Sequence, residues 1–279
     1  MAVDTGPAAP ASEGVNAPGR ARILQRTLRT DNWLQAPLTT GGILVFFIVY
    51  STIRVFMNDY FFVKQFNYLT PMYSPCISVE CPSEAADFGT WVGHMWPFVP
   101  IAIFFFWILG GFRVTCYYYR KAGYRSLWFS PQACAVPEPH KKYTGETRFP
   151  LVFMNSHRYF FWLASLLLLV NFYDAVKAFS GEDGGFRIGL GTLIMVVNVV
   201  ALALYSLSCH ACRHAVGGRI NNFSKHPVRY QLWTWVSKLN PFHGTFAMTS
   251  LFTVILTDAY IMILSIAADG GANTLPGWL

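Results

Sequence analysis

Charged residues are scarce in this chain of 279 residues. Asp, Glu, Lys and Arg together make up 13% of it, about half of the share found in ordinary soluble domains. Apolar residues make up 53% and aromatic residues 17%. A chain with so few charges cannot cover an apolar core with a polar surface. The composition therefore excludes a soluble globular domain and indicates an integral membrane protein.

Motifs that bind nucleotides or support hydrolysis are also missing. The sequence has no P-loop, no GxGxxG fingerprint and no Ser-His-Asp spacing, and its Lys and Arg residues form no dense run. We therefore expect no nucleotide site and no nucleic-acid partner. The first 40 residues are polar and rich in Pro, Ala and Gly, without the apolar h-region of a secretory signal. We expect no cleaved signal peptide.

Five apolar stretches are long enough to cross a membrane, which takes about 20 mostly apolar residues per helix. They cover residues 42–63, 92–112, 159–179, 188–208 and 244–267. We therefore predict an all-α integral membrane protein, with a five-helix transmembrane bundle over residues 31–279 and a flexible N-terminal arm over residues 1–30. The segment Pro227–Leu239 is predicted to form a short helix at the membrane interface.

The basic residues indicate how the chain is oriented. Most of the 21 Lys and Arg residues lie before the first span, between the second and third spans, and between the fourth and fifth. By the positive-inside rule these segments face the cytoplasm, which places the N-terminus there. They also form a basic surface on which a large acidic or mixed-charge partner can dock.

Cysteine residues divide between the two sides of the membrane. Cys76 and Cys81 fall in the outside loop between the first two spans. An oxidising compartment allows them to form a disulfide, and two unpaired thiols are the alternative. The remaining cysteines lie on the cytoplasmic side, where disulfides are rare. There a cysteine is either a metal ligand or an inert core residue.

Soft metal ligands gather at the cytoplasmic ends of four spans. Cys116 follows the second span, His157 precedes the third and His243 precedes the fifth, while the string CHACRH at residues 209–214 follows the fourth. Because alternating helices bring these ends to one side at similar depth, the side chains can face a common point. Thiolate and imidazole suit a Rieske-type [2Fe-2S] centre or a structural zinc ion, and two facing histidines can hold a b-type haem. For any single residue, an inert buried thiol or an interfacial polar anchor is the alternative.

Three of the charged residues inside the apolar runs are informative. They are Arg54, Asp174 and Asp258, and such residues are costly in a membrane unless they are paired or functional. Arg54 can pair with either aspartate in the bundle interior, which is a structural role. A role in a proton path is the alternative.

Several strings carry a family resemblance. They are TCYYYRK at residues 115–121, TGET at 144–147, NSHRYF at 155–160, SCHACRHAVGG at 208–218 and NPFHG at 240–244. Together they resemble the membrane anchor subunit of bacterial succinate dehydrogenase, respiratory complex II, in the branch with a single five-helix anchor. The resemblance covers roughly residues 30–270 and implies a multi-pass protein of the bacterial inner membrane.

The resemblance implies electron transfer by a non-autonomous subunit of succinate dehydrogenase. A flavoprotein subunit oxidises succinate, an iron–sulfur subunit passes the electrons on, and the anchor delivers them to a membrane quinone. A higher oligomer of the complex is also compatible with the sequence. By their depth Tyr119, Arg213 and His214 are candidates for binding the quinone, and each can equally be an anchor at the lipid interface.

The resemblance also bears on the cofactor. Better-known five-helix anchors hold two b haems through histidines of their first four helices, but here the first span has no histidine and Cys116 stands where a haem ligand is expected. The branch that this sequence most resembles carries a Rieske-like [2Fe-2S] cluster. The ligands implied are Cys116, Cys209, His210 and His243, with His157, His214 and Cys212 as substitutes. A haem-b anchor of a related quinone oxidoreductase and a transporter with structural zinc are the alternatives.

Overall fold

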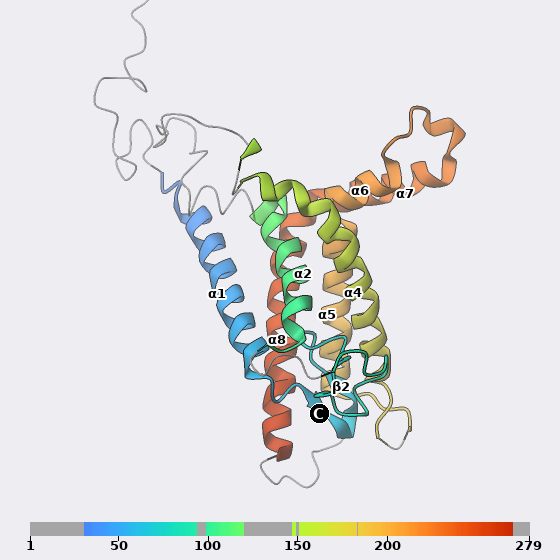
Figure 1. Ribbon diagram of the computed structural model, residues 1–279. Helices are drawn as coiled ribbons and strands as arrows, with labels where there is room; N and C mark the ends of the chain where they lie inside the picture. The colour runs from blue at the N-terminus through green and yellow to red at the C-terminus, as the bar shows by residue number, and fades with distance from the viewer. Residues whose placement is uncertain (1–30, 94–98, 120–146, 149–150, 183, 270–279) are drawn as a thin grey trace, which may run out of the picture.

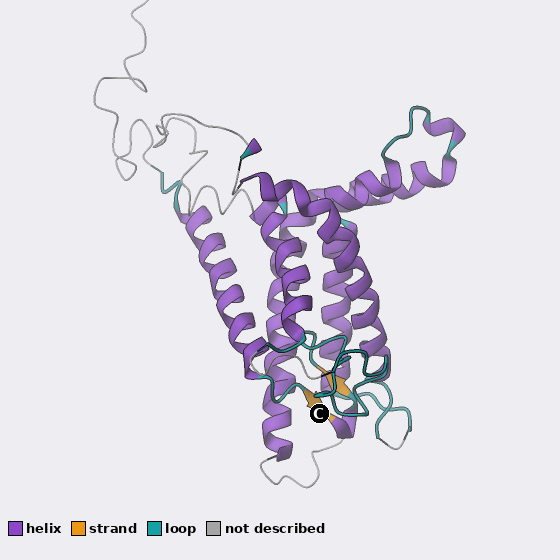
Figure 2. Ribbon diagram, viewed as in Figure 1, coloured by secondary structure: helices purple, strands orange, loops and turns teal. Residues whose placement is uncertain are grey.

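The computed structural model describes residues 31–93, 99–119, 147–148, 151–182 and 184–269 (Figure 1). The predicted N-terminal arm, residues 1–30, lies outside this part of the chain. What is described is mostly helical, with loops and one small sheet (Figure 2). The long helices run side by side as a bundle (Figure 1), and they are α1 (Gln35–Met57), α2 (Ala102–Thr115), α4 (His157–Lys177), α5 (Leu190–Leu207) and α8 (His243–Asp269).

Within the described residues, four helical stretches are long and apolar enough to cross a membrane, which agrees with the prediction of an all-α membrane protein. They are Gln35–Met57, Val152–Lys177, Leu190–Leu207 and Pro227–Asp269, the last of which includes α8. With 14 residues, α2 is shorter than the others. It is apolar and packs against α1 and α4 within the bundle.

Two helix boundaries differ from the sequence prediction. The first helix ends at Met57, because Asn58 adopts a left-handed conformation with φ of 50°, and the following residues form a loop up to Phe62. The second begins at Ala102, later than predicted. Val92, where we expected the helix to start, instead pairs with Ser78 in an isolated β-bridge. Apolar composition alone could not separate the helix from the apolar loop that precedes it.

A small loop structure covers the end of the bundle opposite to the start of α1 (Figure 1). It contains a two-stranded antiparallel sheet of β1 (Phe62–Val63) and β2 (Tyr68–Leu69), joined by the 3₁₀ helix η1 (Lys64–Phe66). The ring of Tyr68 packs on α5 at Gly191, where a Cβ atom would lie 2.2 Å from the ring. Cys76 and Cys81, the pair proposed from the sequence, are joined by a disulfide in this loop region.

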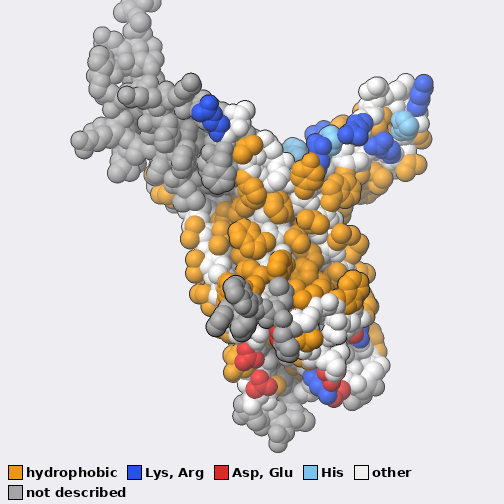
Figure 3. Space-filling view, viewed as in Figure 1, with side chains coloured by type: hydrophobic (Ala, Val, Ile, Leu, Met, Phe, Trp, Pro, Cys, Tyr) orange, Lys and Arg blue, Asp and Glu red, His pale blue; other side chains and the backbone are white. Residues whose placement is uncertain are grey.

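At the other end, an arm of two helices leaves the bundle sideways (Figure 1). It consists of α6 (His210–Gly217), the 3₁₀ helix η5 (Phe223–Lys225) and α7 (Pro227–Leu239). The bounds of α7 are those predicted. Lys, Arg and His side chains lie on the upper side of the arm in the view of Figure 3, and hydrophobic side chains lie on its underside. This asymmetry is typical of a helical segment at a membrane interface.

A buried ion pair holds α1 to α8. The Nε atom of Arg54 donates to the Asp258 carboxylate at 2.7 Å, and the two side chains are 2% and 0% exposed. The hydroxyls of Tyr50 and Thr70 donate to the same carboxylate. Asp174, the other partner that the sequence allowed for Arg54, accepts instead from Ser74. Full pairing of Asp258 supports the structural role for this group.

We predict that Asp258→Asn destabilises the bundle strongly, because it leaves the Arg54 guanidinium buried without a counter-charge. Breaking a buried pair in this way costs about 3–5 kcal/mol. Denaturant or thermal unfolding of the protein in detergent measures the loss. The control is Asp87→Asn, which removes the partner of Lys177 at 3.3 Å in a partly exposed pair at the surface and should cost about 1 kcal/mol or less. Equal losses in the two variants would contradict the assignment.

Candidate metal centre

Two cysteines and two histidines from four segments meet at the end of the bundle from which the arm leaves. The Sγ atom of Cys116 lies 3.2 Å from Nε2 of His243, and the Sγ atom of Cys209 lies 3.1 Å from Nε2 of His157. The four residues belong to the end of α2, the start of α4, the junction of α5 with α6, and the start of α8. We refer to them as the Cys–His cluster.

Local backbone geometry explains why these residues project inward. Each cysteine occupies a break between helical segments in extended conformation, Cys116 at φ −62° and ψ 135° and Cys209 at φ −68° and ψ 145°. Each histidine is the first residue of a long helix that follows a 3₁₀ turn, η4 (Leu151–Ser156) before His157 and η6 (Asn240–Phe242) before His243. The cluster is therefore built from helix ends, where side chains can leave the regular helical surface.

A hydroxyl residue next to each cysteine orients the histidine of the other pair. Thr115 Oγ1 lies 3.0 Å from Nδ1 of His157, and Ser208 Oγ lies 2.8 Å from Nδ1 of His243. Each hydroxyl already donates its proton to a backbone carbonyl, that of Gly111 or Tyr205. Each hydroxyl can therefore only accept a hydrogen bond from the Nδ1–H of its histidine. The histidine then carries its proton on Nδ1, and the lone pair of Nε2 is directed at the cysteine sulfur. Metal-binding histidines are commonly held in this way.

Aromatic rings close the cluster from inside the bundle. Phe112 stacks on the His157 imidazole with centroids 4.9 Å apart, and Tyr205 stacks on the His243 imidazole at 5.0 Å. Both cysteines are only 1% exposed. Burial raises the pKa of the Cys209 thiol to about 12, because desolvation disfavours the thiolate. A metal ion must therefore displace a proton from this sulfur in order to bind it.

The donor set fits a metal centre of the mixed cysteine and histidine type. Two thiols and two imidazoles with free Nε2 lone pairs are the ligands of a Rieske-type cluster and also of a Cys₂His₂ zinc site. The contacts of 3.1 and 3.2 Å are hydrogen bonds, so these must open to admit a metal. In the part of the chain that the structure describes, no three His, Cys, Asp or Glu side chains converge tightly enough to hold a single ion.

The other predicted ligands lie apart from this contact network. His210 and His214 are exposed and, four residues apart on α6, lie on one face of it. Cys212 is buried on the same helix, and burial raises its pKa. The structure thus brings His157, rather than His210, to the cysteines. Two features of the sequence could have indicated this choice of histidine. A hydroxyl residue, Thr115 or Ser208, precedes each cysteine, and His157 and His243 each stand at the start of a helix.

The three residues predicted to bind quinone differ in their surroundings. Tyr119 is fully buried and donates to the Ala247 carbonyl at 2.8 Å, and burial raises its pKa to about 12. Arg213 lies over the Trp233 ring at 4.8 Å and donates to Ser237, while His214 is exposed. Their contact with quinone stays a prediction.

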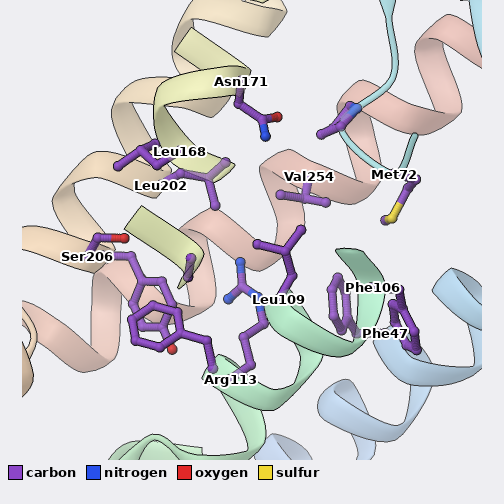
Figure 4. Close-up of a pocket in the computed structure, with 14 residues that line it drawn as sticks. Phe47, Met72, Phe106, Leu109, Arg113, Leu168, Asn171, Leu202, Ser206 and Val254 are labelled. Atoms are coloured by element: carbon purple, nitrogen blue, oxygen red, sulfur yellow. The ribbon is translucent and has the colours of Figure 1, made fainter. Parts of the chain in front are cut away.

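A narrow cavity of about 40 Å³ lies in the bundle beside the cluster (Figure 4). Its walls are mainly apolar, and Arg113, Asn171 and Ser206 contribute polar groups. Phe112 and Tyr205 separate it from the two imidazoles, since they line the cavity and stack on the histidines. The predicted second span ended at residue 112, which left Arg113 in the basic connection that follows, whereas the structure places it in α2 in the interior. Its position one helical turn before Cys116 was the available signal.

Comparison with known proteins identifies the family. The sequence matches the family model described as actinobacterial succinate dehydrogenase subunit SdhC over residues 35–267. The fold matches a chain of the solved Mycobacterium smegmatis Sdh1 complex in the apo form, with a TM-score of 0.83 and 56% sequence identity over 90% of this chain and 95% of that chain. No match was found among curated proteins. The chain therefore belongs to the family of actinobacterial SdhC proteins, the membrane anchor subunits of succinate dehydrogenase.

Proposed function

We propose that this subunit carries electrons from the iron–sulfur subunit of succinate dehydrogenase to membrane quinone, through a [2Fe-2S] centre held by the Cys–His cluster. The observation that carries the proposal is the convergence of Cys116, Cys209, His157 and His243, with both Nε2 lone pairs directed inward. When bound, such a centre takes up and releases one electron at a time. Histidine ligation raises its potential relative to all-cysteine clusters, which suits delivery to a quinone.

The protein's part in this function is to hold and shield the ligands. Thr115 and Ser208 fix the tautomers of the histidines, so that each Nε2 can bind without rearrangement of the ring. Phe112 and Tyr205 cover the imidazoles and exclude water from the bundle side. Burial on this scale leaves neighbouring dipoles and charges poorly screened, and so strengthens their effect on the centre.

The alternatives fit less well. A haem between His157 and His243 would have to displace the aromatic rings that stack on both imidazoles. Zinc suits the four donors chemically but could not carry electrons. The match to the SdhC family model argues against the transporter alternative.

We further propose the arrangement of the subunit in the inner membrane of a bacterium. The start of α1 and the arm of α6 and α7 lie at the same end of the bundle (Figure 1), and the basic residues of the arm support a cytoplasmic location for that end. On this proposal α2 is the fifth membrane-crossing helix, and residues 31–279 form one transmembrane domain. The basic cytoplasmic end then faces the iron–sulfur subunit, with the flavoprotein subunit beyond it.

Spectroscopy of the purified protein with its partners tests the nature of the centre. We expect a rhombic EPR signal that appears on reduction, together with iron and acid-labile sulfide in addition to those of the soluble subunits. A haem α-band in the reduced protein would favour the haem-b alternative. A stoichiometric metal without any optical or EPR signature would indicate zinc.

Substitution of the ligands gives a second prediction. His157→Ala and His243→Ala should each lower the rate of quinone reduction by about 100-fold or more. Loss of a residue that hydrogen-bonds to a metal ligand typically lowers metal affinity or activity about 10–100-fold, and loss of the ligand itself should have a larger effect. Reduction of an artificial dye by succinate should persist, because the path breaks only beyond the soluble subunits. Cys116→Ser and Cys209→Ser should behave in the same way.

The matched control is His210→Ala, which changes a histidine adjacent to Cys209 that lies on the exposed surface. It should keep the cluster signal and most of the quinone activity. Loss of the signal in His210→Ala together with its retention in His157→Ala would show that the cluster uses the ligand set implied by the family resemblance instead.

The partners provide a third prediction. Because the sequence has no flavin, nucleotide or dicarboxylate motif, the isolated subunit should not oxidise succinate. Affinity capture of the tagged subunit in mild detergent should bring down a flavoprotein and an iron–sulfur protein in equal amounts. Capture of the intact subunit without a flavoprotein would contradict the proposed function.

A further inference from the structure

Arg113 is a buried cation whose partners in the described part of the chain are all neutral. Its side chain lies in α2 and is 3% exposed. The guanidinium donates to the Ala247 carbonyl at 3.1 Å, to Ser250 Oγ at 3.2 Å and to Tyr119 Oη at 3.4 Å. Among the described residues no carboxylate forms an ion pair with it, in contrast to Arg54, which is paired with Asp258.

An unpaired charge in the interior of a membrane protein is costly, and residues of this kind are usually functional. The three neutral acceptors satisfy some of the five N–H donors of the guanidinium but do not balance its charge. A state of the protein that places negative charge beside Arg113 is therefore stabilised relative to one that does not.

The Cys–His cluster is the place where such negative charge can arise. The carbonyl of Arg113 accepts from the backbone N–H of Cys116 at 3.1 Å. Its guanidinium carbon lies 5.0 Å from the centre of the Tyr205 ring, and the same ring lies 5.0 Å from the imidazole of His243. The guanidinium carbon of Arg113 is therefore no more than about 10 Å from the imidazole of His243, a proposed ligand. Figure 4 shows it extending from α2 towards the cavity.

Tyr205 supplies an independent observation. It is almost fully buried, and its hydroxyl has no hydrogen-bond partner among the residues that the structure describes. The Tyr205 side chain lies close to the sulfur of Cys116. A buried donor left unsatisfied is unfavourable, and it would be satisfied by a sulfur that carries negative charge.

We propose that Arg113 and Tyr205 are positioning residues that stabilise the reduced form of the centre, Arg113 by its fixed charge and Tyr205 by donating to the Cys116 sulfur. The inference rests on the proposed function. One electron arrives from the iron–sulfur subunit and adds one negative charge to the centre, and the same electron leaves to quinone. Hydrogen bonds to ligand sulfur and nearby charge are established means of tuning iron–sulfur potentials.

The test is a potentiometric titration of the centre by EPR in the complete complex. Arg113→Gln should shift the equilibrium towards the oxidised form about tenfold, as expected for loss of a unit charge within about 10 Å in a protein interior. This corresponds to a fall in midpoint of about 59 mV for one electron. Iron and sulfide content should not change. Arg113→Lys, which keeps the charge, should restore most of the midpoint, and Tyr205→Phe should lower it by a smaller amount.

The control is Lys177→Gln, which removes one positive charge at the opposite end of α4 and should leave the midpoint unchanged. An unaltered midpoint in an Arg113→Gln complex that contains the cluster would overturn the inference while leaving the proposed function intact. If Arg113→Gln does not assemble, Tyr205→Phe decides, since an unchanged midpoint there overturns the inference and a lower one supports it. Absence of the EPR signal from the unmodified complex would instead overturn the proposed function, and the inference with it.

Discussion

The crossed pairing of two cysteines with two histidines is the constraint that organises the end of the bundle from which the arm leaves. Cys116 contacts His243 and Cys209 contacts His157, so α2 is tied to α8, and the junction of α5 with α6 is tied to α4. Each histidine is also held by the hydroxyl residue that precedes the cysteine of the other pair. The four segments therefore cannot shift independently, and the four side chains have fixed orientations without any bound metal.

The buried charges at the two ends of the bundle have different kinds of partner. At the end covered by the β1–β2 loop structure, Asp258 balances Arg54 and takes further hydrogen bonds from two hydroxyls. This closed network locks α1 to α8 and has no charge left over. At the cluster end, Arg113 has neutral acceptors only. The first arrangement suits stability, and the second suits a site whose charge changes during turnover.

The arm of α6 and α7 connects the cluster to the surface of the molecule. Cys209 is the residue before α6 and accepts from the Ala211 amide, so the helix that leaves the bundle begins at a proposed ligand. The arm carries basic side chains on one side and hydrophobic side chains on the other (Figure 3). A partner bound to the basic side would therefore lie close to the Cys–His cluster.

The sequence by itself determined the class of protein, most helix positions, the interfacial segment Pro227–Leu239 and the end of the bundle at which Cys and His residues gather. These properties depend on local composition and on the alternation of helix direction. Tertiary structure decided which side chains meet. His210 is adjacent to Cys209 in sequence but lies on the exposed side of α6, whereas His157 reaches Cys209 from another helix. Likewise, Asp258 rather than Asp174 pairs with Arg54, and Arg113 lies inside the bundle rather than in the basic loop. These outcomes depend on helix rotation and on where each helix ends, which are fixed by packing between segments far apart in the chain.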